Sequence, residues 1–158
     1  MMKLENPILL SWCNFTPLHR TPWAGSQIAK LKSELQGVCS NDLIGESWEF
    51  SCDPDFPSQL AHVNTPLHEL IKNNLHALLG PYANSPHDCQ ILVKLIGTKM
   101  PLSVQVHPTD DDPNLTSSET GKPESWLILD KAPGSGVYLG FKEGLSVEEA
   151  FEKIKNVC

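Results

Sequence analysis

The sequence predicts a single domain that is mainly β-structure, with a few helices added. Thirteen prolines and ten glycines among 158 residues imply many turns, which favours a β-rich or mixed fold over a helical bundle. Short apolar segments with strand character recur along the chain, and two longer stretches have helical patterns. A chain of this length can bury a hydrophobic core. Because neither an internal repeat nor a linker is visible, we treat 1–158 as one domain.

Five segments have the composition and flanking turns of β-strands. Some of them are largely apolar or alternate between apolar and polar residues over a short run that turn residues bound. The last two resemble a strand pair joined by a Pro-Gly turn. The predicted strands are 44–51, 89–96, 102–107, 125–130 and 136–141. We expect the second of these, which contains Lys94 within an apolar run, to be buried.

Two segments carry helix signals. Thr65 and Pro66 suit an N-cap and a first turn, a stripe of apolar residues follows at helical spacing, and Gly80 ends it. This predicts a helix at about 65–79. A capping box formed by Ser146 and Glu149 predicts a second helix, at about 146–156.

Composition excludes several classes of protein. A net charge of −7 argues against nucleic-acid binding, because phosphate contacts need a basic face. No apolar run is long enough to cross a bilayer. The five cysteines are odd in number and no pair has the close spacing of a zinc or redox motif, so we expect reduced thiols in a cytoplasmic protein.

The most informative stretch is 102–126. On a strand, Gln105 and His107 would point to the same face, and a following strand that begins near Glu124 could bring a carboxylate to it. Such a cluster is a plausible site for a divalent metal such as zinc. The simpler interpretation is a structural histidine with a satisfied hydrogen bond, and the spacing alone leaves both open.

Two lysines are weaker candidates for a substrate pocket. Lys94 is either a pocket cation or a lysine that reaches an edge or pairs with a carboxylate, which is the more common case. Lys122 lies two residues before Glu124, so it could hold a substrate phosphate as a point charge. An ordinary solvated loop lysine is the more common case, and from the residues alone it is the preferred interpretation of Lys122.

Five motifs occur in order along the chain. They are Pro22-Trp-Ala-Gly, Ile44-Gly-Glu-Ser-Trp-Glu, Leu102-Ser-Val-Gln-Val-His-Pro, Gly121-Lys-Pro-Glu-Ser-Trp and Ala132-Pro-Gly-Ser-Gly-Val-Tyr-Leu-Gly. Together they resemble one known family, the type I phosphomannose isomerases in their shorter bacterial form. The resemblance covers nearly the whole chain from Pro22 onward.

The resemblance implies a cupin fold, that is, a jelly-roll β-barrel or sandwich with one divalent metal, usually zinc. It implies the interconversion of mannose 6-phosphate and fructose 6-phosphate through an enediol(ate). By motif, Gln105, His107 and Glu124 match metal ligands, and Lys122 matches a lysine of the substrate or phosphate site. Ser103, on the same face as Gln105, would line the pocket.

The resemblance also implies a departure. The family has a further histidine ligand and an arginine in a downstream half, which this chain apparently lacks. The alternative to a mannose-6-phosphate isomerase is therefore a truncated or non-catalytic cupin-like domain that binds metal weakly or self-associates. Half a barrel would leave open edges. The chain would then be a fragment, a subunit that associates with itself or with a completing chain, or a rearranged stand-alone domain.

Overall fold

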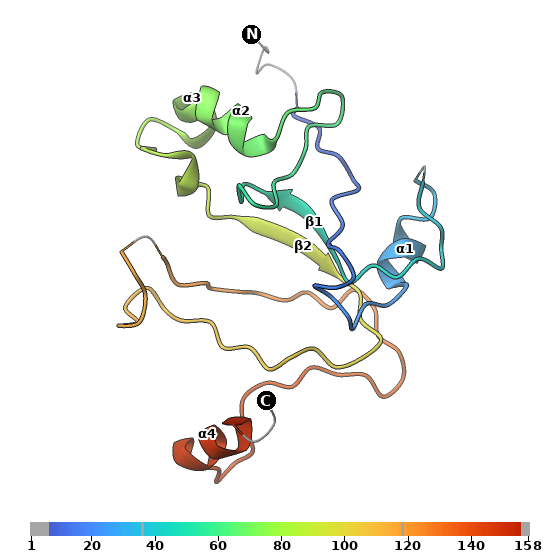
Figure 1. Ribbon diagram of the computed structural model, residues 1–158, viewed down its shortest axis with the longest axis vertical. Helices are drawn as coiled ribbons and strands as arrows, with labels where there is room; N and C mark the ends of the chain where they lie inside the picture. The colour runs from blue at the N-terminus through green and yellow to red at the C-terminus, as the bar shows by residue number, and fades with distance from the viewer. Residues whose placement is uncertain (1–6, 36, 118, 156–158) are drawn as a thin grey trace. The chain divides into compact units, whose positions relative to one another are not determined.

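The computed structural model describes residues 7–35, 37–117 and 119–155. The chain divides into two compact units, Met1–Val104 and Gln105–Cys158. The described elements are α1 (Gln27–Leu31), β1 (Glu46–Ser51), α2 (Leu67–Asn73), α3 (Leu75–Leu79), the 3-10 helix η1 (Pro86–Asp88), β2 (Leu92–Ile96) and α4 (Val147–Lys155) (Figure 1). Of these, α4 belongs to the second unit. The prediction of one domain over 1–158 stays a prediction.

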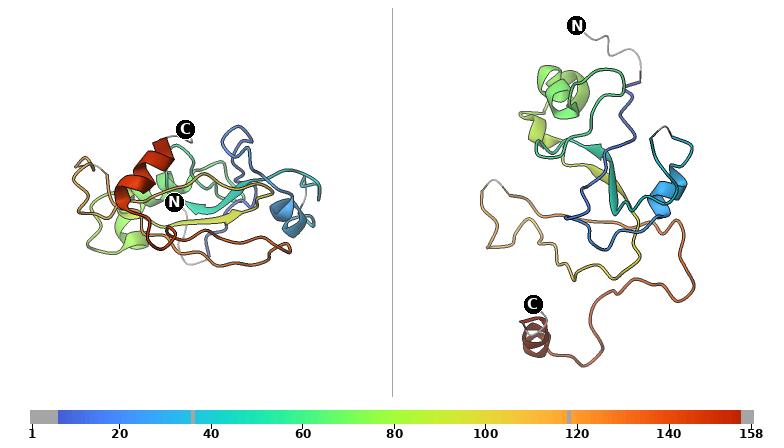
Figure 2. Two further views of the ribbon diagram at one scale, coloured as in Figure 1. Left: turned by 90° about the horizontal axis from the view of Figure 1, so that it is seen from below. Right: turned by 45° about the vertical axis from the view of Figure 1, so that its right-hand side comes forward.

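An antiparallel pair of strands lies at the centre of the first unit. β1 and β2 are far apart in the sequence but lie side by side in every view (Figure 2). Their register places Glu46 opposite Ile96 and Ser51 opposite Leu92, and a bulge interrupts it after Trp48. This register brings the end of β1 and the start of β2 to the same end of the sheet.

The two strands of this sheet were both predicted. The segment 44–51 contains β1, and the apolar run 89–96 contains β2, so their strand character is confirmed. The expected burial of the second segment is wrong, because Val93 is 50 % exposed. The apolar run does form a strand, but one with an uncovered start.

The prediction of a mainly β fold with a cupin-type jelly-roll barrel or sandwich is wrong. In the described residues the sheet has two strands and does not close, and helices occupy more of the chain than strands. The segments 102–107, 125–130 and 136–141 have no regular secondary structure. An extended segment becomes a strand only when a neighbouring strand pairs with its backbone, and local alternation does not supply that neighbour.

The helix expected at about 65–79 is present as two short helices. α2 takes Pro66 rather than Thr65 as its N-cap residue, without a side-chain hydrogen bond at the cap. Asn74 separates α2 from α3, and its side-chain amide donates to the carbonyl oxygen of Leu70 at 2.9 Å. α3 ends at Gly80, whose φ of 90° lies in the left-handed region that glycine adopts without strain.

The second predicted helix is α4, and its capping box is formed as expected. The backbone N–H of Glu149 donates to Ser146 Oγ at 3.1 Å, and the backbone N–H of Ser146 donates to the Glu149 carboxylate at 3.0 Å. These bonds satisfy two donors that a helix start would otherwise leave unpaired. The last predicted residue, Asn156, lies outside the described residues.

Two hydrophobic clusters stabilise the first unit. The first joins the end of β1 to α2 and contains Cys52, Leu60, Leu67, Leu70 and Ile71. The second packs around α1 and contains Ile28, Ala29, Val38 and Ile44. Each cluster therefore joins a short helix to residues distant in sequence, which is how helices of this length persist.

The first unit also buries a charged group. Lys32 is 7 % exposed, and its ammonium group donates to the Trp12 carbonyl at 2.7 Å, to Ser47 Oγ at 3.0 Å and to the Glu49 carboxylate at 2.6 Å. It also lies over the ring of Phe15, at 5.4 Å from the centroid. A buried ammonium needs such partners because desolvation is costly.

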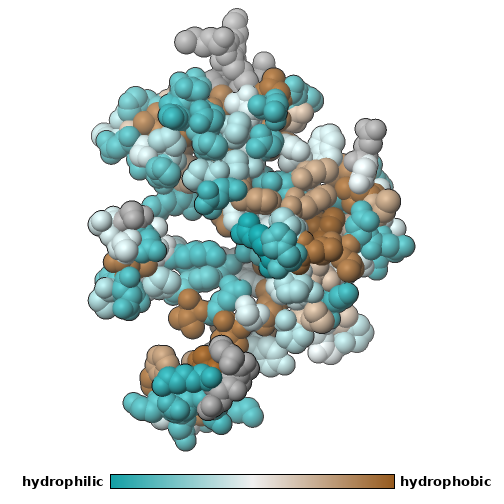
Figure 3. Space-filling model, viewed as in Figure 1, coloured by the Kyte–Doolittle hydropathy of each residue, from teal (hydrophilic) through white to brown (hydrophobic). Residues whose placement is uncertain are grey.

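The second unit buries much less. Of its described residues, 105–117 and 119–155, only Ala150 is buried. Large apolar side chains are exposed along its extended part, among them Leu127 (83 %), Tyr138 (95 %) and Leu139 (95 %). Figure 3 shows hydrophobic residues (brown) on this face of the molecule, and the widest such area lies in the first unit, around α1.

The helices of the structure are short. In the part of the chain that the structure describes, none is both long and apolar enough to cross a membrane.

Candidate functional site

His107 lies in an extended segment that opens the second unit. Its neighbour Val106 is 82 % exposed, whereas the side chain of His107 is 26 % exposed. Adjacent side chains of an extended chain point in opposite directions, so His107 is the more sheltered of the two.

A polar loop, 109–120, carries the chain out and back, as the two long arms of Figures 1 and 2 show. The N–H of Gly121 donates to the Asp110 carboxylate at 2.8 Å, and the N–H of Lys122 donates to the Pro108 carbonyl at 3.1 Å. A Cβ atom on Gly121 would lie 2.6 Å from the backbone nitrogen of Asp110. Only glycine therefore permits this close approach.

The returning segment brings Glu124 to His107. His107 Nε2 and Glu124 Oε2 are 2.9 Å apart, and both side chains are 26 % exposed. The nitrogen is nevertheless buried and has no hydrogen-bond partner. The two atoms therefore lie within the distance of an ion pair, but no hydrogen bond joins them.

This arrangement fits a divalent cation. With its proton on Nδ1, His107 presents a lone pair on Nε2, and a glutamate carboxylate is an anionic oxygen ligand. Two atoms that each bind the same zinc ion at about 2 Å lie about 3 Å apart. Burial of an imidazole nitrogen without a hydrogen bond costs free energy, unless a third group such as a metal ion binds that nitrogen.

The pair alone is an incomplete ligand set. Within residues 7–35, 37–117 and 119–155, no group of three or more His, Cys, Asp and Glu side chains is placed to hold a metal. A third ligand would have to be of another type. Gln105, two residues before His107 in the same segment, is exposed and carries an amide oxygen of that kind.

The remaining predicted site residues are placed as follows. Lys122 is exposed, and its backbone is fixed by the bond to Pro108. Ser103 is exposed and belongs to the first unit. Their predicted roles at a substrate phosphate and in a pocket stay predictions.

Lys94 has the carboxylate partner that its simpler interpretation expects. Its ammonium group lies 2.9 Å from Glu46 Oε1, and the second oxygen of Glu46 accepts a hydrogen bond from Trp48 Nε1 at 2.9 Å. The two charged side chains are 19 % and 14 % exposed. This ion pair ties β1 to β2, and the pocket role of Lys94 stays a prediction.

A hollow of about 280 Å³ lies beside the polar loop, but it does not coincide with the candidate ligands. It is lined by Val106, Pro108, Asp112, Asn114, Leu115 and Glu119. Val106 and Pro108 flank His107 in sequence, yet His107 itself and Glu124 are not part of the lining. The chemistry of the donors, rather than this hollow, defines the candidate site.

One juxtaposition escaped the sequence patterns. The sulfur atoms of Cys52 and Cys89 are 3.2 Å apart although 37 positions separate the residues. Local cysteine spacing cannot reveal such a pair. The signal that could have found it is the pairing of the predicted strands 44–51 and 89–96, which brings both cysteines to one end of the sheet.

Two curated proteins are similar in sequence to this chain, and both are named as isomerases of a sugar phosphate. A mannose-6-phosphate isomerase of Streptococcus mutans is 28 % identical over 140 residues, which are 87 % of this chain and 42 % of that protein. A probable mannose-6-phosphate isomerase of Bacillus subtilis is 41 % identical over 64 residues, 40 % of this chain and 20 % of that protein. These matches support a relationship to the phosphomannose isomerases.

The matches are partial in a specific way. The aligned part of this chain spans less than half the length of either relative. No family model matches the chain, and no solved structure matches it. The relationship therefore rests on sequence similarity to these two proteins and on the ordered motifs.

Proposed function

We propose that this chain takes part in the metal-dependent interconversion of mannose 6-phosphate and fructose 6-phosphate. The observation that carries the proposal is the meeting of His107 Nε2 and Glu124 Oε2 at 2.9 Å, with the nitrogen buried and without a hydrogen bond. The names of the two curated relatives support the substrate and the reaction.

In this proposal His107, Glu124 and Gln105 hold one zinc ion. Imidazole, carboxylate and amide are a nitrogen and oxygen donor set suited to a borderline divalent cation. The bound ion would supply a Lewis acid and a template for the sugar oxygens. Because Gly121 holds the returning segment against the outgoing one, it positions Glu124 for this role.

The chain's other candidate residues act on the substrate rather than on the metal. Lys122 presents a point charge to the phosphate from a backbone that its bond to Pro108 fixes. Ser103 and Lys94 belong to the first unit, and their pocket roles stay predictions; the one for Lys94 is the weaker because Glu46 already pairs with it. Conversion of an aldose to a ketose moves a proton between adjacent carbons through an enediol(ate), and we assign no residue as that base.

A second candidate function is a non-catalytic domain that associates with copies of itself. The exposed apolar side chains of Trp126, Leu127, Leu139 and Phe141, each more than half exposed, favour it. Exposed apolar surface of this extent is typical of an interaction site. In this case the metal site, if it forms, would be structural or weak.

One experiment separates the two candidates. The purified 158-residue chain is assayed for isomerase activity with mannose 6-phosphate, and zinc content and molar mass are measured on the same sample. Turnover with stoichiometric zinc supports the isomerase and excludes the inert domain. An inactive, zinc-free oligomer supports the self-associating domain and overturns the metal-dependent function for this chain.

The variants Gln105→Ala, His107→Ala and Glu124→Ala sharpen the result. Each should lower zinc content and activity together if the three residues hold the metal. Zinc content that stays at the wild-type level in all three variants would contradict the assignment. Lys122→Ala should instead raise KM for the sugar phosphate while zinc content is unchanged.

A further inference from the structure

Cys52 and Cys89 form a close pair in the first unit. Cys52 directly follows β1, and Cys89 follows η1 and precedes β2. The two sulfur atoms are 3.2 Å apart, with the Cys52 thiol oriented toward Cys89 Sγ. A disulfide bond is about 2 Å long, so the sulfurs need to approach by roughly 1 Å more.

The pair is positioned by the fold rather than by local sequence. The register that places Ser51 opposite Leu92 brings the end of β1 and the start of β2 together. Cys52 belongs to the hydrophobic cluster that includes Leu60 and Ile71, and Cys89 packs against the same cluster. The backbone on both sides is therefore anchored, and this limits how far the sulfurs can separate.

The two cysteines differ in accessibility. Cys52 is buried, whereas Cys89 is partly exposed. Burial and the neighbouring Cys89 raise the pKa of the Cys52 thiol to about 12, so it is a neutral thiol at physiological pH. A small reagent therefore reaches Cys89 first, and Cys52 is protected from direct attack.

We propose that Cys52 and Cys89 form an oxidation site that closes to an internal disulfide in the presence of a low-molecular-weight disulfide of the glutathione class. The Cys89 thiolate attacks the small disulfide, forms a mixed disulfide and releases one small thiolate. Cys52 then loses its proton to solvent and attacks Cys89 Sγ, which releases the second small thiolate. The two protein thiols lose two electrons and two protons, and the small disulfide is reduced to two thiols.

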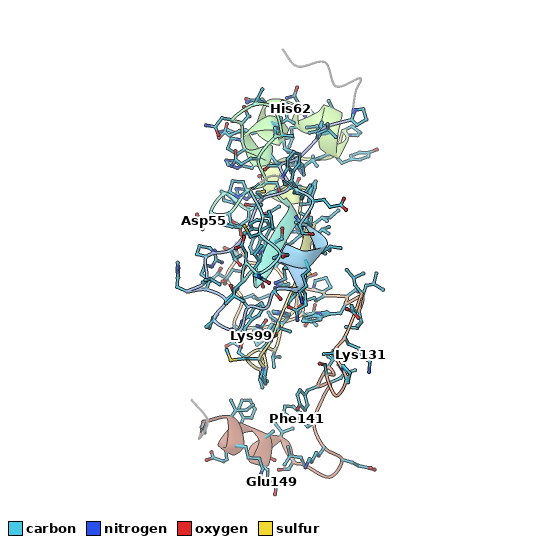
Figure 4. All side chains as sticks on the ribbon, turned by 90° about the vertical axis from the view of Figure 1, so that its right-hand side faces the viewer. Asp55, His62, Lys99, Lys131, Phe141 and Glu149 are labelled. Atoms are coloured by element: carbon cyan, nitrogen blue, oxygen red, sulfur yellow. The ribbon has the colours of Figure 1, made fainter. Side chains whose placement is uncertain are left out.

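The disulfide would enclose the segment that contains α2, α3 and η1. Asp55 and His62, labelled in Figure 4, lie on the part of this segment that leads from β1 to α2. A cross-link over 37 positions restricts the unfolded chain, so the oxidised form should unfold at a higher temperature than the reduced form. The site would thus couple the redox state to the stability of the helical segment.

The test uses the whole chain and oxidised glutathione as the probe. After incubation and alkylation of the remaining thiols in denaturant, the intact chain should carry two fewer alkyl groups than the reduced and alkylated chain, and peptide mapping should show Cys52 linked to Cys89. The midpoint of thermal unfolding should rise by roughly 10 °C relative to the same sample reduced with dithiothreitol.

Matched variants keep the result interpretable. Cys13→Ser and Cys39→Ser remove exposed thiols outside the pair and should leave both readouts unchanged. Cys89→Ser should abolish both, and if it fails to fold, the peptide map of the wild type decides alone. A stable glutathione adduct on Cys89, or linkage through Cys13, Cys39 or Cys158 in place of the pair, overturns the proposal.

Discussion

The two units of this chain differ in how far they bury apolar and charged side chains. In the first unit, Ile28 of α1 and Ile71 of α2 fall below 10 % exposure, and a lysine is buried with three hydrogen-bond acceptors. In the described residues of the second unit, most large apolar side chains are exposed. Most of its backbone hydrogen bonds close local turns, and the bond from Lys122 to Pro108 is an exception. The first unit is stabilised by contacts between residues distant in sequence, and the second largely by neighbours.

This difference shows what an apolar pattern can and cannot specify. The segments 44–51 and 126–129 are both rich in residues that favour strands, yet only the first pairs with another strand. The first has β2 beside it and a cluster beneath it, whereas the second is extended and exposed. Strand formation depends on a partner, which is a property of the whole fold.

The largest effect should come from the hydrophobic clusters. Ile71→Ala removes most of a side chain that is 3 % exposed and should lower the free energy of unfolding by about 4 kcal/mol. The matched change Leu139→Ala, at a side chain that is 95 % exposed, should alter it by less than about 0.5 kcal/mol. Urea titration of both variants measures these changes. Equal losses of unfolding free energy in the two variants would contradict the difference between the units.

The next effect concerns two lysine–glutamate pairs. Lys32→Met leaves Glu49 without its cation and the Trp12 carbonyl without its donor, so stability should fall by about 3 kcal/mol. Lys155 pairs with Glu152 at 3.0 Å on α4, but both side chains are about two-thirds exposed (67 % and 68 %). Lys155→Met should therefore cost less than about 0.5 kcal/mol. A Lys32→Met protein as stable as the wild type would show that the buried pair contributes nothing.

The elements that sequence predicted well are those with a local cause. The capping box of Ser146 and Glu149 starts α4 as expected, and Gly80 ends α3 as expected. Burial of Lys32 and approach of Cys52 to Cys89 were not predicted, because both depend on which segments the sheet brings together. The expected β-barrel failed for the same reason.

The candidate site likewise has one part that the sequence predicted and one part that it did not. That Glu124 could reach His107 followed from the sequence and from the family motifs, and the structure places the two side chains 2.9 Å apart. The reason they meet was not visible in a pattern. It is the close approach of Gly121 to the backbone of Asp110, which needs the folded loop to be recognised.

A smaller effect on stability should follow from adding a side chain at Gly121, where the backbone segments of the loop approach closely. Gly121→Ala forces a Cβ against the backbone of Thr109 and Asp110, so the loop must open at a cost of about 2 kcal/mol. Hydrogen exchange at the amides of Gly121 and Lys122 should accelerate. Gly136→Ala is the matched control, because nothing lies within 4 Å of an added Cβ there. Unchanged exchange in the Gly121 variant would mean that the loop does not depend on this contact.

The smallest effect should be a local dependence on pH. The backbone N–H and the hydroxyl of Thr116 donate to the Glu119 carboxylate at 2.9 Å and 2.8 Å, which holds the pKa of Glu119 below its ordinary value of 4.5. Because the pKa of Glu119 is lowered, the turn is stabilised at a pH above the ordinary pKa of glutamate. This stabilisation is lost as the pH falls through the lowered pKa. The NMR shift of the Thr116 amide should follow this titration.

A variant tests the assignment of that titration. In Glu119→Gln the titration of the Thr116 amide should disappear. A titration midpoint at or above the ordinary pKa of glutamate in the wild type would contradict the hydrogen bonds from Thr116 to Glu119.

The most direct test of the central claim is zinc binding to the purified 158-residue chain, measured by calorimetric titration. The account predicts one zinc per chain, and a loss of affinity of more than about tenfold in His107→Ala and in Glu124→Gln. His19→Ala, which removes an exposed histidine of the first unit, should bind as the wild type does. Absence of zinc binding in the wild type, or wild-type affinity in both site variants, would contradict a metal site at His107 and Glu124.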